Sequence, residues 1–265
     1  TNTTATAVST VNTSGGGGTG VSNCFTAGVT ADGTDATFIA NMYHELLGRD
    51  PDSGGQAFWA DFLNRDGHAN TLNNPRRMQM VQFFRASQEY RENVVNCIYE
   101  HFLNRGADAG GLQFFSTQLA AGVNEQIVLS EIVGSQEYFL INGNTNTGFA
   151  DALYRDLLGR TADSGGEAYW ANRASTAGLS RDQVVRDMLN TTEAEQDLLV
   201  NSSSSALSQV TGGGWENLYF QGNLGSTPGN VNDVFFQKLQ AHTPWDDVIE
   251  DMLESNHYYD ATKGV

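Results

Sequence analysis

Apolar residues recur along the chain at three- and four-residue spacings, which is the period of an amphipathic α-helix. The first such stretch places five apolar side chains on one helical face: Ile39, Met42, Tyr43, Leu46 and Leu47. Gly48 follows directly and favours a helix end, because glycine readily adopts the left-handed backbone that closes helices. We therefore predict that the folded body begins with a helix near Asp35.

The next two stretches predict two further helices. Ser53 and Gln56 stand three residues apart, as in a capping box, and Ser164 with Glu167 repeats this arrangement. We assign to the buried face of the second helix the aromatics Phe58, Trp59 and Phe62. A third helix contains Met80, Val81, Phe83 and Phe84 and leads to Ser87-Gln88-Glu89-Tyr90. Strand-like alternation is nearly absent, so the pattern predicts a three-helix module.

This module occurs three times in tandem. The copies begin MYHELLGRDPDSGGQAFW, IYEHFLNRGADAGGLQFF and LYRDLLGRTADSGGEAYW, and Tyr43, Tyr99 and Tyr154 lie 56 and 55 residues apart. A weaker fourth copy is indicated by Val234-Phe235-Phe236, by Trp245 and by Ser255-Asn256-His257-Tyr258. Tandem units of this size are typical of scaffolds and binding surfaces.

We predict an all-α fold of tandem small helical modules behind an extended N-terminal tail. The expected boundaries are a Thr/Gly-rich tail over 1–36, helical repeats over 37–92, 93–142 and 149–200, a Ser/Gly linker over 201–214, and a partial fourth repeat over 215–260. No breaker separates Glu89 from Leu103, so the first two repeats are expected to share one helix. Asn142-Gly143-Asn144 predicts a loop before the third.

Residues 216–222 read ENLYFQG, which is the recognition sequence of TEV-type proteases. We interpret it as an engineered cleavage site without native function. The alternative is a natural helix of this sequence, because Leu218-Tyr219 align with Leu153-Tyr154 of the third repeat.

The formal net charge of −17 limits the partners of the chain. Such a polyanion is expected to repel nucleic acid and anionic lipid surfaces. No segment is apolar over the length that crosses a bilayer, so membrane insertion is not expected. The first residue is Thr1 rather than Met, which favours an exported protein, extracellular or at the cell surface.

The chain has two cysteines, Cys24 in the polar tail and Cys97 in the second repeat. In an exported protein we expect them to form a disulfide. That bond would close a loop of about 70 residues and contribute roughly 4 kcal/mol in the chain-entropy model. Two unrelated free thiols are the alternative.

The first repeat contains a candidate calcium site. In an EF-hand register Asp50 and Asp52 would be the first and third ligands and Asp61 the last. Gly54 at the fifth position offers no side-chain oxygen, and the other copies lose further ligands. Because Asp52, Asp108 and Asp163 recur, helix capping is the alternative that we favour, and no cofactor is required.

Two further features recur in every copy. Arg49, Arg105 and Arg160 end the first helix, where a cation complements the helix dipole and can pair with the following Asp. The alternative is a role in holding a partner. The aromatic pairs are assigned to the core with one member reaching the surface, and stacking on a glycan is the alternative: Phe58-Trp59, Phe114-Phe115, Tyr169-Trp170 and Phe235-Phe236.

Catalytic motifs are missing from the sequence. The histidines do not recur at equivalent positions, and no HExxH, GxSxG, Walker or CxxC motif occurs. We therefore expect that the protein is not an enzyme.

The recurring pattern LY-x-x-LLGR-x-x-D-x-GG-x-x-YW, closed by Ser-x-Glu-aromatic, resembles a bacterial domain of unknown function related to phycobilisome linker domains. The second copy departs from it at Asn104, which replaces the motif glycine, and the third lacks the closing aromatic in Thr191-Thr192-Glu193-Ala194. The resemblance implies a helical fold and an assembly or adhesion role, since such domains occur as repeats in secreted and surface-layer proteins.

We accordingly expect an exported structural subunit that self-assembles into an extracellular filament or surface layer, with its tail contacting a neighbouring subunit. The alternatives are an adhesin-type binding module for a glycan or protein, and an acidic linker protein of another complex.

Overall fold

The computed structural model describes residues 32–176, 178–195, 234–254 and 259. Within these ranges the regular structure is helical and contains no β-strand, which confirms the all-α fold. Residues 1–31 of the predicted tail, the linker over 201–214, the protease-site sequence over 216–222 and Cys24 lie outside the described residues.

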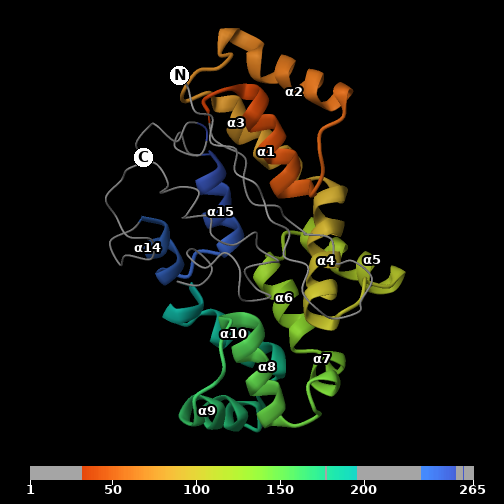
Figure 1. Ribbon diagram of the computed structural model, residues 1–265, viewed down its shortest axis with the longest axis vertical. Coiled ribbons are helices and arrows are strands. Elements are labelled where there is room, and N and C mark those ends of the chain that lie inside the picture. Colours follow the sequence, from red (N-terminus) through yellow and green to blue (C-terminus); the bar gives the residue numbers. More distant parts are fainter. Residues whose placement is uncertain (1–31, 177, 196–233, 255–258, 260–265) are drawn as a thin grey trace, which may run out of the picture.

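The helices follow the predicted modules (Figure 1). The first repeat comprises α1 (Asp35–Leu47), α2 (Ser53–Asn64), the short 3₁₀ helix η1 (Arg65–Gly67) and α3 (Pro75–Arg85). The second comprises α4 (Gln88–Leu103), α5 (Ala109–Ala120) and α6 (Glu125–Val133). The short α7 (Gln136–Ile141) leads to the third, which comprises α8 (Asn146–Leu158), α9 (Ser164–Ala174) and α10 (Arg181–Leu189). A C-terminal pair follows, α14 (Val234–Gln240) and α15 (Trp245–Glu254).

The junctions between repeats agree with the sequence. Helix α4 runs without a break from the end of the first repeat into the second, as expected from the absence of a breaker after Glu89. Residues 142–145 form a loop before α8. No helix of the described part of the chain is both long enough and apolar enough to cross a membrane.

The core is made largely by the first and third helices of the repeats. Their apolar faces are almost fully buried at repeating positions, for example Met80 and Val81 in α3, Val128 and Leu129 in α6, and Val184 and Val185 in α10. Helices α2, α5 and α9 lie at the periphery (Figure 1). The second helix of each repeat therefore presents one face to its neighbours and the other to solvent.

The repeats do not form a simple linear stack. Helix α10 of the third repeat packs against α6 of the second, and α15 returns to pack against α3 of the first. The hydroxyl of Tyr259 donates to Asp35 over 3.1 Å, and the guanidinium of Arg77 lies 3.6 Å from the centre of the Tyr259 ring. The C-terminal pair is thus docked on the first two repeats, which the repeat pattern alone did not predict.

Candidate functional site

Every repeat has the same junction between its first two helices. The first helix ends on a left-handed residue, with φ of 66° at Gly48, 56° at Asn104 and 62° at Gly159. The amide of the next residue, an arginine in each copy, then donates back to the carbonyl of the tyrosine six residues earlier, as in Arg49 to Tyr43 over 3.3 Å. Asparagine is the residue after glycine that tolerates this conformation, which explains why Asn104 replaces the motif glycine without changing the turn.

The recurring aspartates cap the second helix. The carboxylates of Asp52, Asp108 and Asp163 accept from the amides of Gly55, Gly111 and Gly166 over 2.8, 2.9 and 2.9 Å. This is the capping role favoured from the sequence. The capping-box assignment was wrong in register, because Ser53 and Ser164 are the first residues inside the helix and the aspartate before each is the cap.

The recurring tyrosine explains the second glycine of each GG pair. A Cβ atom on Gly55 would lie 2.2 Å from the Tyr43 hydroxyl oxygen, and on Gly111 it would lie 2.5 Å from that of Tyr99. In the third copy, a Cβ atom on Gly166 would lie 2.1 Å from the Tyr154 hydroxyl oxygen. The tyrosine and the glycine are therefore one feature, in which the ring lies against the bare backbone of the next helix.

The recurring arginine binds a glutamate at the far end of its own repeat. Arg49 Nε and Nη2 donate to the two carboxylate oxygens of Glu89 over 2.5 and 3.0 Å. Arg105 binds Glu137 in the same two-pronged geometry over 2.6 and 2.7 Å. Arg160 binds Glu193 likewise, with its Nη2 at 2.8 Å from Oε2.

Each guanidinium also lies over the ring of the recurring tyrosine, at 4.9 Å from the centroid in the first two copies and 4.7 Å in the third. The sequence predicts the following aspartate as the partner of the arginine. Arg105 does approach Asp108 at 3.6 Å, but its two-pronged contact is with Glu137. The Glu of the Ser-x-Glu motif was the signal that could have found this partner.

The arginine–glutamate pairs change the proton affinity of their members. Hydrogen bonds from Arg105 hold the pKa of Glu137 below its usual value, and hydrogen bonds from Arg160 do the same to the pKa of Glu193. The hydrogen bond to Glu137 in turn raises the pKa of Arg105. The exposed fractions of these six side chains lie between 38% and 47%, so each pair stabilises the fold only modestly.

Replacing Arg105 by glutamine is expected to lower the free energy of unfolding by about 0.5 kcal/mol, within the range for exposed ion pairs. The loss should disappear in a Glu137→Gln background, as measured by a double-mutant cycle of guanidinium unfolding curves. Because the folded pKa of Glu137 is depressed, this coupling is present above pH 4.5 and is lost as the pH falls through the lowered value. A coupling energy of zero at pH 7 would contradict the assignment.

One member of each aromatic pair reaches the surface in the three full repeats, as predicted, but the assignment of Phe58 to the buried face of its helix was wrong. Phe58, Phe114 and Tyr169 are 54%, 58% and 57% exposed on the outer face of α2, α5 and α9. The neighbouring ring packs edge-on against each at 5.0 Å and faces the core. In the C-terminal pair Phe235 is buried. We call the three exposed rings the aromatic row.

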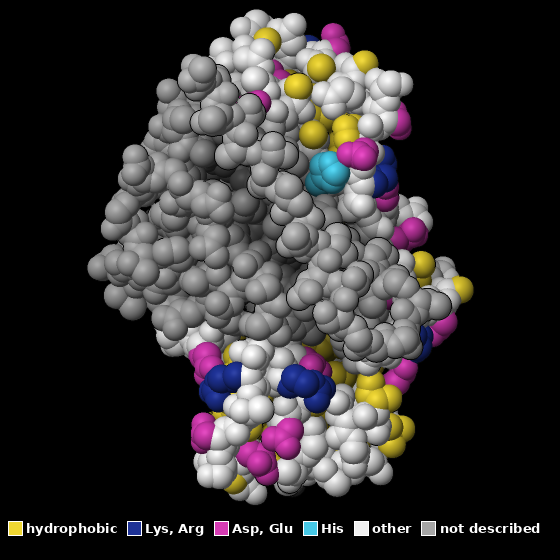
Figure 2. Space-filling model, in the orientation of Figure 1, with side chains coloured by type: hydrophobic (Ala, Val, Ile, Leu, Met, Phe, Trp, Pro, Cys, Tyr) yellow, Lys and Arg dark blue, Asp and Glu magenta, His cyan; other side chains and the backbone are white. Residues whose placement is uncertain are grey.

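Further apolar side chains are exposed on the same repeats. Phe83 on α3 is 58% exposed and lies about 6 Å from the rings of Trp59 and Phe62. An apolar groove beside Phe114 is lined by Gly110, Ala121 and Val123. Figure 2 shows hydrophobic side chains at the surface over α2, and others over α7, where Leu140 and Ile141 are exposed.

The three candidate calcium ligands are not brought together. Asp50 accepts from His44 Nε2 at 2.9 Å, Asp52 caps α2, and Asp61 faces Arg65 at 3.3 Å. The described residues hold no group of three or more His, Cys, Asp or Glu side chains arranged for a metal ion. The residues present do not fit the calcium loop expected from their spacing, and calcium binding stays an untested hypothesis.

Cys97 is buried in α4 and is disulfide-bonded, and the described part of the chain has no free cysteine. Cys24 is the other cysteine of the sequence and lies outside the described residues. The pairing of Cys24 with Cys97 therefore stays a prediction.

The family matches correspond to the three repeats. Three segments of the chain, residues 19–94, 82–141 and 129–198, match the model of a family described as Domain of unknown function (DUF4214). The chain belongs to this family. No curated protein and no solved structure matches the chain.

The three DUF4214 matches overlap over residues 82–94 and 129–141, which contain Glu89 and Glu137. Each overlap thus includes the glutamate that binds the arginine of the preceding repeat. A DUF4214 unit in this chain is closed by the segment that opens the next one, which makes the arginine–glutamate pair the connection between units. The C-terminal pair α14–α15 lies outside the matched residues.

Proposed function

We propose that the protein is an exported structural subunit that self-associates through the aromatic row into an extracellular filament or surface layer. One observation carries this proposal: every full repeat exposes an aromatic ring at the same position of its peripheral helix. A row of exposed rings on one chain offers the same contact several times over, and repeated contacts of this kind propagate when their rotation does not close.

The geometry of the repeats supports a rigid spacing between the rings. The arginine–glutamate pairs join the start and the end of each repeat in the same way, and the tyrosine–glycine contact fixes each second helix on its first. The apolar groove beside Phe114 can accept a ring from a second copy. The net charge of −17 opposes association, so assembly is expected to increase with salt, which screens like charges.

Replacing the three exposed rings together, as Phe58→Ser, Phe114→Ser and Tyr169→Ser, is expected to abolish self-association while the helical circular dichroism spectrum is kept. The physical reason is that exposed side chains contribute contact area between copies and little to the core. Sedimentation velocity and negative-stain electron microscopy of wild type and variant, at low and high salt, measure the effect. A calcium and a chelator sample test the Asp50 hypothesis at the same time.

The matched control is Leu140→Ser with Ile141→Ser, which removes exposed apolar surface on α7 but leaves the aromatic row intact. Assembly should survive in the control. If the wild type stays monomeric at every concentration and salt, or if both variants lose assembly equally, the proposal is wrong.

The exposed rings also favour a second candidate, an adhesin-type module that stacks them on a glycan. In that case dispersed monomers would bind an immobilised glycan saturably, and the ring variant would lose this binding. The resemblance to phycobilisome linker domains suggests a third, an acidic linker, for which a protein partner of fixed stoichiometry would be recovered.

A further inference from the structure

Four charged side chains and a tyrosine meet where α15 packs against the body of the protein. Arg85 at the end of α3 faces Asp246 and Glu250 of α15, with Nη2 at 3.2 Å from Asp246 Oδ2 and Nη1 hydrogen-bonded to Glu250. Glu125 at the start of α6 lies 3.7 Å from the same guanidinium. The hydroxyl of Tyr90, from α4, donates to Glu125 over 2.6 Å.

This cluster carries more negative than positive charge. Three carboxylates share one guanidinium, and the exposed fractions of the four side chains are between 11% and 24%. Two other charged residues line the same pocket: Arg91, whose Nη1 donates to the carbonyl of Ala86, and Asp247 of α15. In a site with so little water, full ionisation of all three carboxylates is costly.

Burial raises the pKa values of two carboxyl groups in the cluster. Desolvation, with the neighbouring charge of Asp246, raises the pKa of Glu125 to about 7. Desolvation also raises the pKa of Asp246, and it raises that of Tyr90 well above its usual value, so the phenol stays a hydrogen-bond donor. One oxygen of Asp246, Oδ1, has no hydrogen-bond partner among the described residues.

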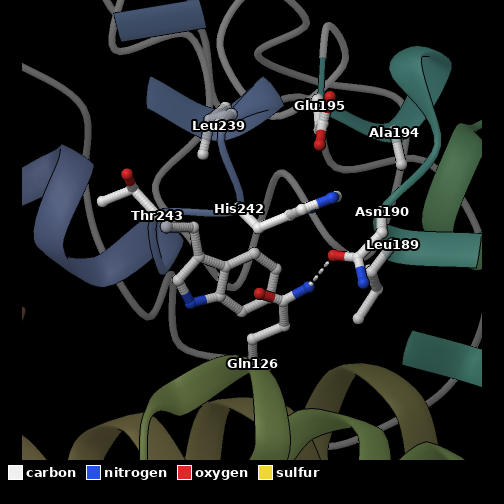
Figure 3. Close-up of a pocket in the computed structure, with 9 residues that line it drawn as sticks. Gln126, Leu189, Asn190, Ala194, Glu195, Leu239, His242 and Thr243 are labelled. Atoms are coloured by element: carbon white, nitrogen blue, oxygen red, sulfur yellow. Dashed lines mark hydrogen bonds between the residues drawn. The ribbon is translucent and has the colours of Figure 1, made fainter. Parts of the chain in front are cut away.

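A second buried carboxylate lies where α14 meets the body. Glu195 accepts from the side chain of Gln240 and is 6% exposed. Figure 3 shows the cavity of about 30 Å³ beside it, into which Gln126 reaches from α6 and Leu239 from α14. Gln126 donates to Asn190 there over 3.0 Å, and His242 is the other titratable group that lines the cavity. Desolvation raises the pKa of Glu195 to about 7.

We propose that the docking of α14–α15 on the three repeats is a proton-controlled latch, held by neutral Glu125 and Glu195 and loosened when these carboxyls ionise. Both groups lie at contacts of the C-terminal pair with the body, Glu125 beside Asp246 of α15 and Glu195 beside Gln240 of α14. The latch concerns the docking of the pair and does not depend on the proposed assembly.

The direction of the pH effect follows from linkage. Glu125 has a higher proton affinity in the docked state than in water, where its pKa is 4.5. Docking is therefore strongest at low pH and weakens as the pH rises from about 4.5 through about 7. Between pH 6 and pH 8 the equilibrium constant for docking is expected to fall about tenfold from Glu125 alone, and to change little above pH 8.

Hydrogen exchange of the full-length protein from pH 5.5 to 8.5, corrected for the intrinsic rate, tests the latch. Peptides covering 245–254 should lose at least about tenfold in protection between pH 6 and pH 8, and about a hundredfold if both carboxyls act on α15, while peptides covering 146–158 in α8 keep theirs. In Glu125→Gln the side chain is neutral at every pH and can still accept from Tyr90. This variant should lose less protection of α15 between pH 6 and pH 8 than the wild type does, and the remaining loss comes from Glu195.

The matched control is Glu131→Gln, which removes a carboxylate from the same helix where Gln118 binds it at 3.1 Å, away from α15. It should keep the wild-type profile. If Glu125→Gln fails to fold, Glu250→Gln serves instead. Removing this negative charge should move the midpoint of the protection profile to lower pH, because Glu125 then ionises more easily. The latch is refuted by a wild-type profile that is flat for 245–254. It is equally refuted by an unchanged profile in Glu125→Gln, or by an unmoved midpoint in Glu250→Gln.

Discussion

Replacing Gly134 by alanine is expected to lower the free energy of unfolding by about 2 kcal/mol. Gly134 closes α6 at the point where the start of α10 crosses it, and a Cβ atom would lie 2.4 Å from the backbone nitrogen of Asp182 and 2.5 Å from its Cα. Its φ of −77° suits any residue, so the effect is purely steric. Overpacking costs about 1–3 kcal/mol, and we expect a cost at the upper end of this range because the nearest atoms belong to the backbone, which cannot rotate away. The reduced freedom of the unfolded chain offsets about 0.4–1 kcal/mol.

The measurement is guanidinium unfolding followed by circular dichroism, with Gly106→Ala as the matched control. Gly106 lies in the loop before α5, has no left-handed backbone, and has no atom within 4 Å of an added Cβ. The control should be neutral or slightly more stable. If both variants unfold at the same guanidinium concentration as the wild type, the α6–α10 contact is looser than the structure has it.

Replacing Gly55 by alanine is expected to destabilise the first repeat by about 1–2 kcal/mol, and Tyr43→Phe should restore most of this loss. The added Cβ would lie 2.2 Å from the Tyr43 hydroxyl oxygen but 3.1 Å from Cζ, so removing the hydroxyl relieves the closest contact. Overpacking sets the cost, and the better helix propensity of alanine offsets up to about 1 kcal/mol of it.

A double-mutant cycle of unfolding free energies measures the coupling between Tyr43 and Gly55. The neighbouring Gly54→Ala is the matched control, because its Cβ would approach only Asp52 Oδ1, at 3.2 Å. It should change stability by less than Gly55→Ala. Simple additivity of Tyr43→Phe and Gly55→Ala would contradict the ring-on-backbone contact.

The recurrence of this contact explains why four features of the repeat occur together. The tyrosine needs a glycine opposite it, the arginine lies over the tyrosine ring, and the aspartate caps the helix whose first turn contains the glycine. The left-handed residue at Gly48 or Asn104 turns the chain so that these groups meet. A unit that kept the tyrosine but lost the glycine would contain a steric clash.

Local chemistry allowed the sequence to determine the helices and their ends. Hydrophobic spacing placed the helices of all three repeats, Gly48 and Gly159 marked helix ends, and the recurring Asp52, Asp108 and Asp163 were recognised as caps. Each of these signals acts within one or two helical turns, so it can be read without knowing the fold. The capping box at Ser53 was misplaced because aspartate and serine, both good caps, stand side by side there.

Only the tertiary structure decided which distant groups meet. Arg49 binds a glutamate 40 residues away, and Arg85 binds α15 more than 160 residues away. The exposed member of each aromatic pair also depends on which neighbour covers the other. Tandem modules of this pattern can stack in a line or fold back, since the local pattern is satisfied in both. The return of α15 to α3, and the buried carboxylates that it brings to Arg85, follow from long-range packing that no local pattern encodes.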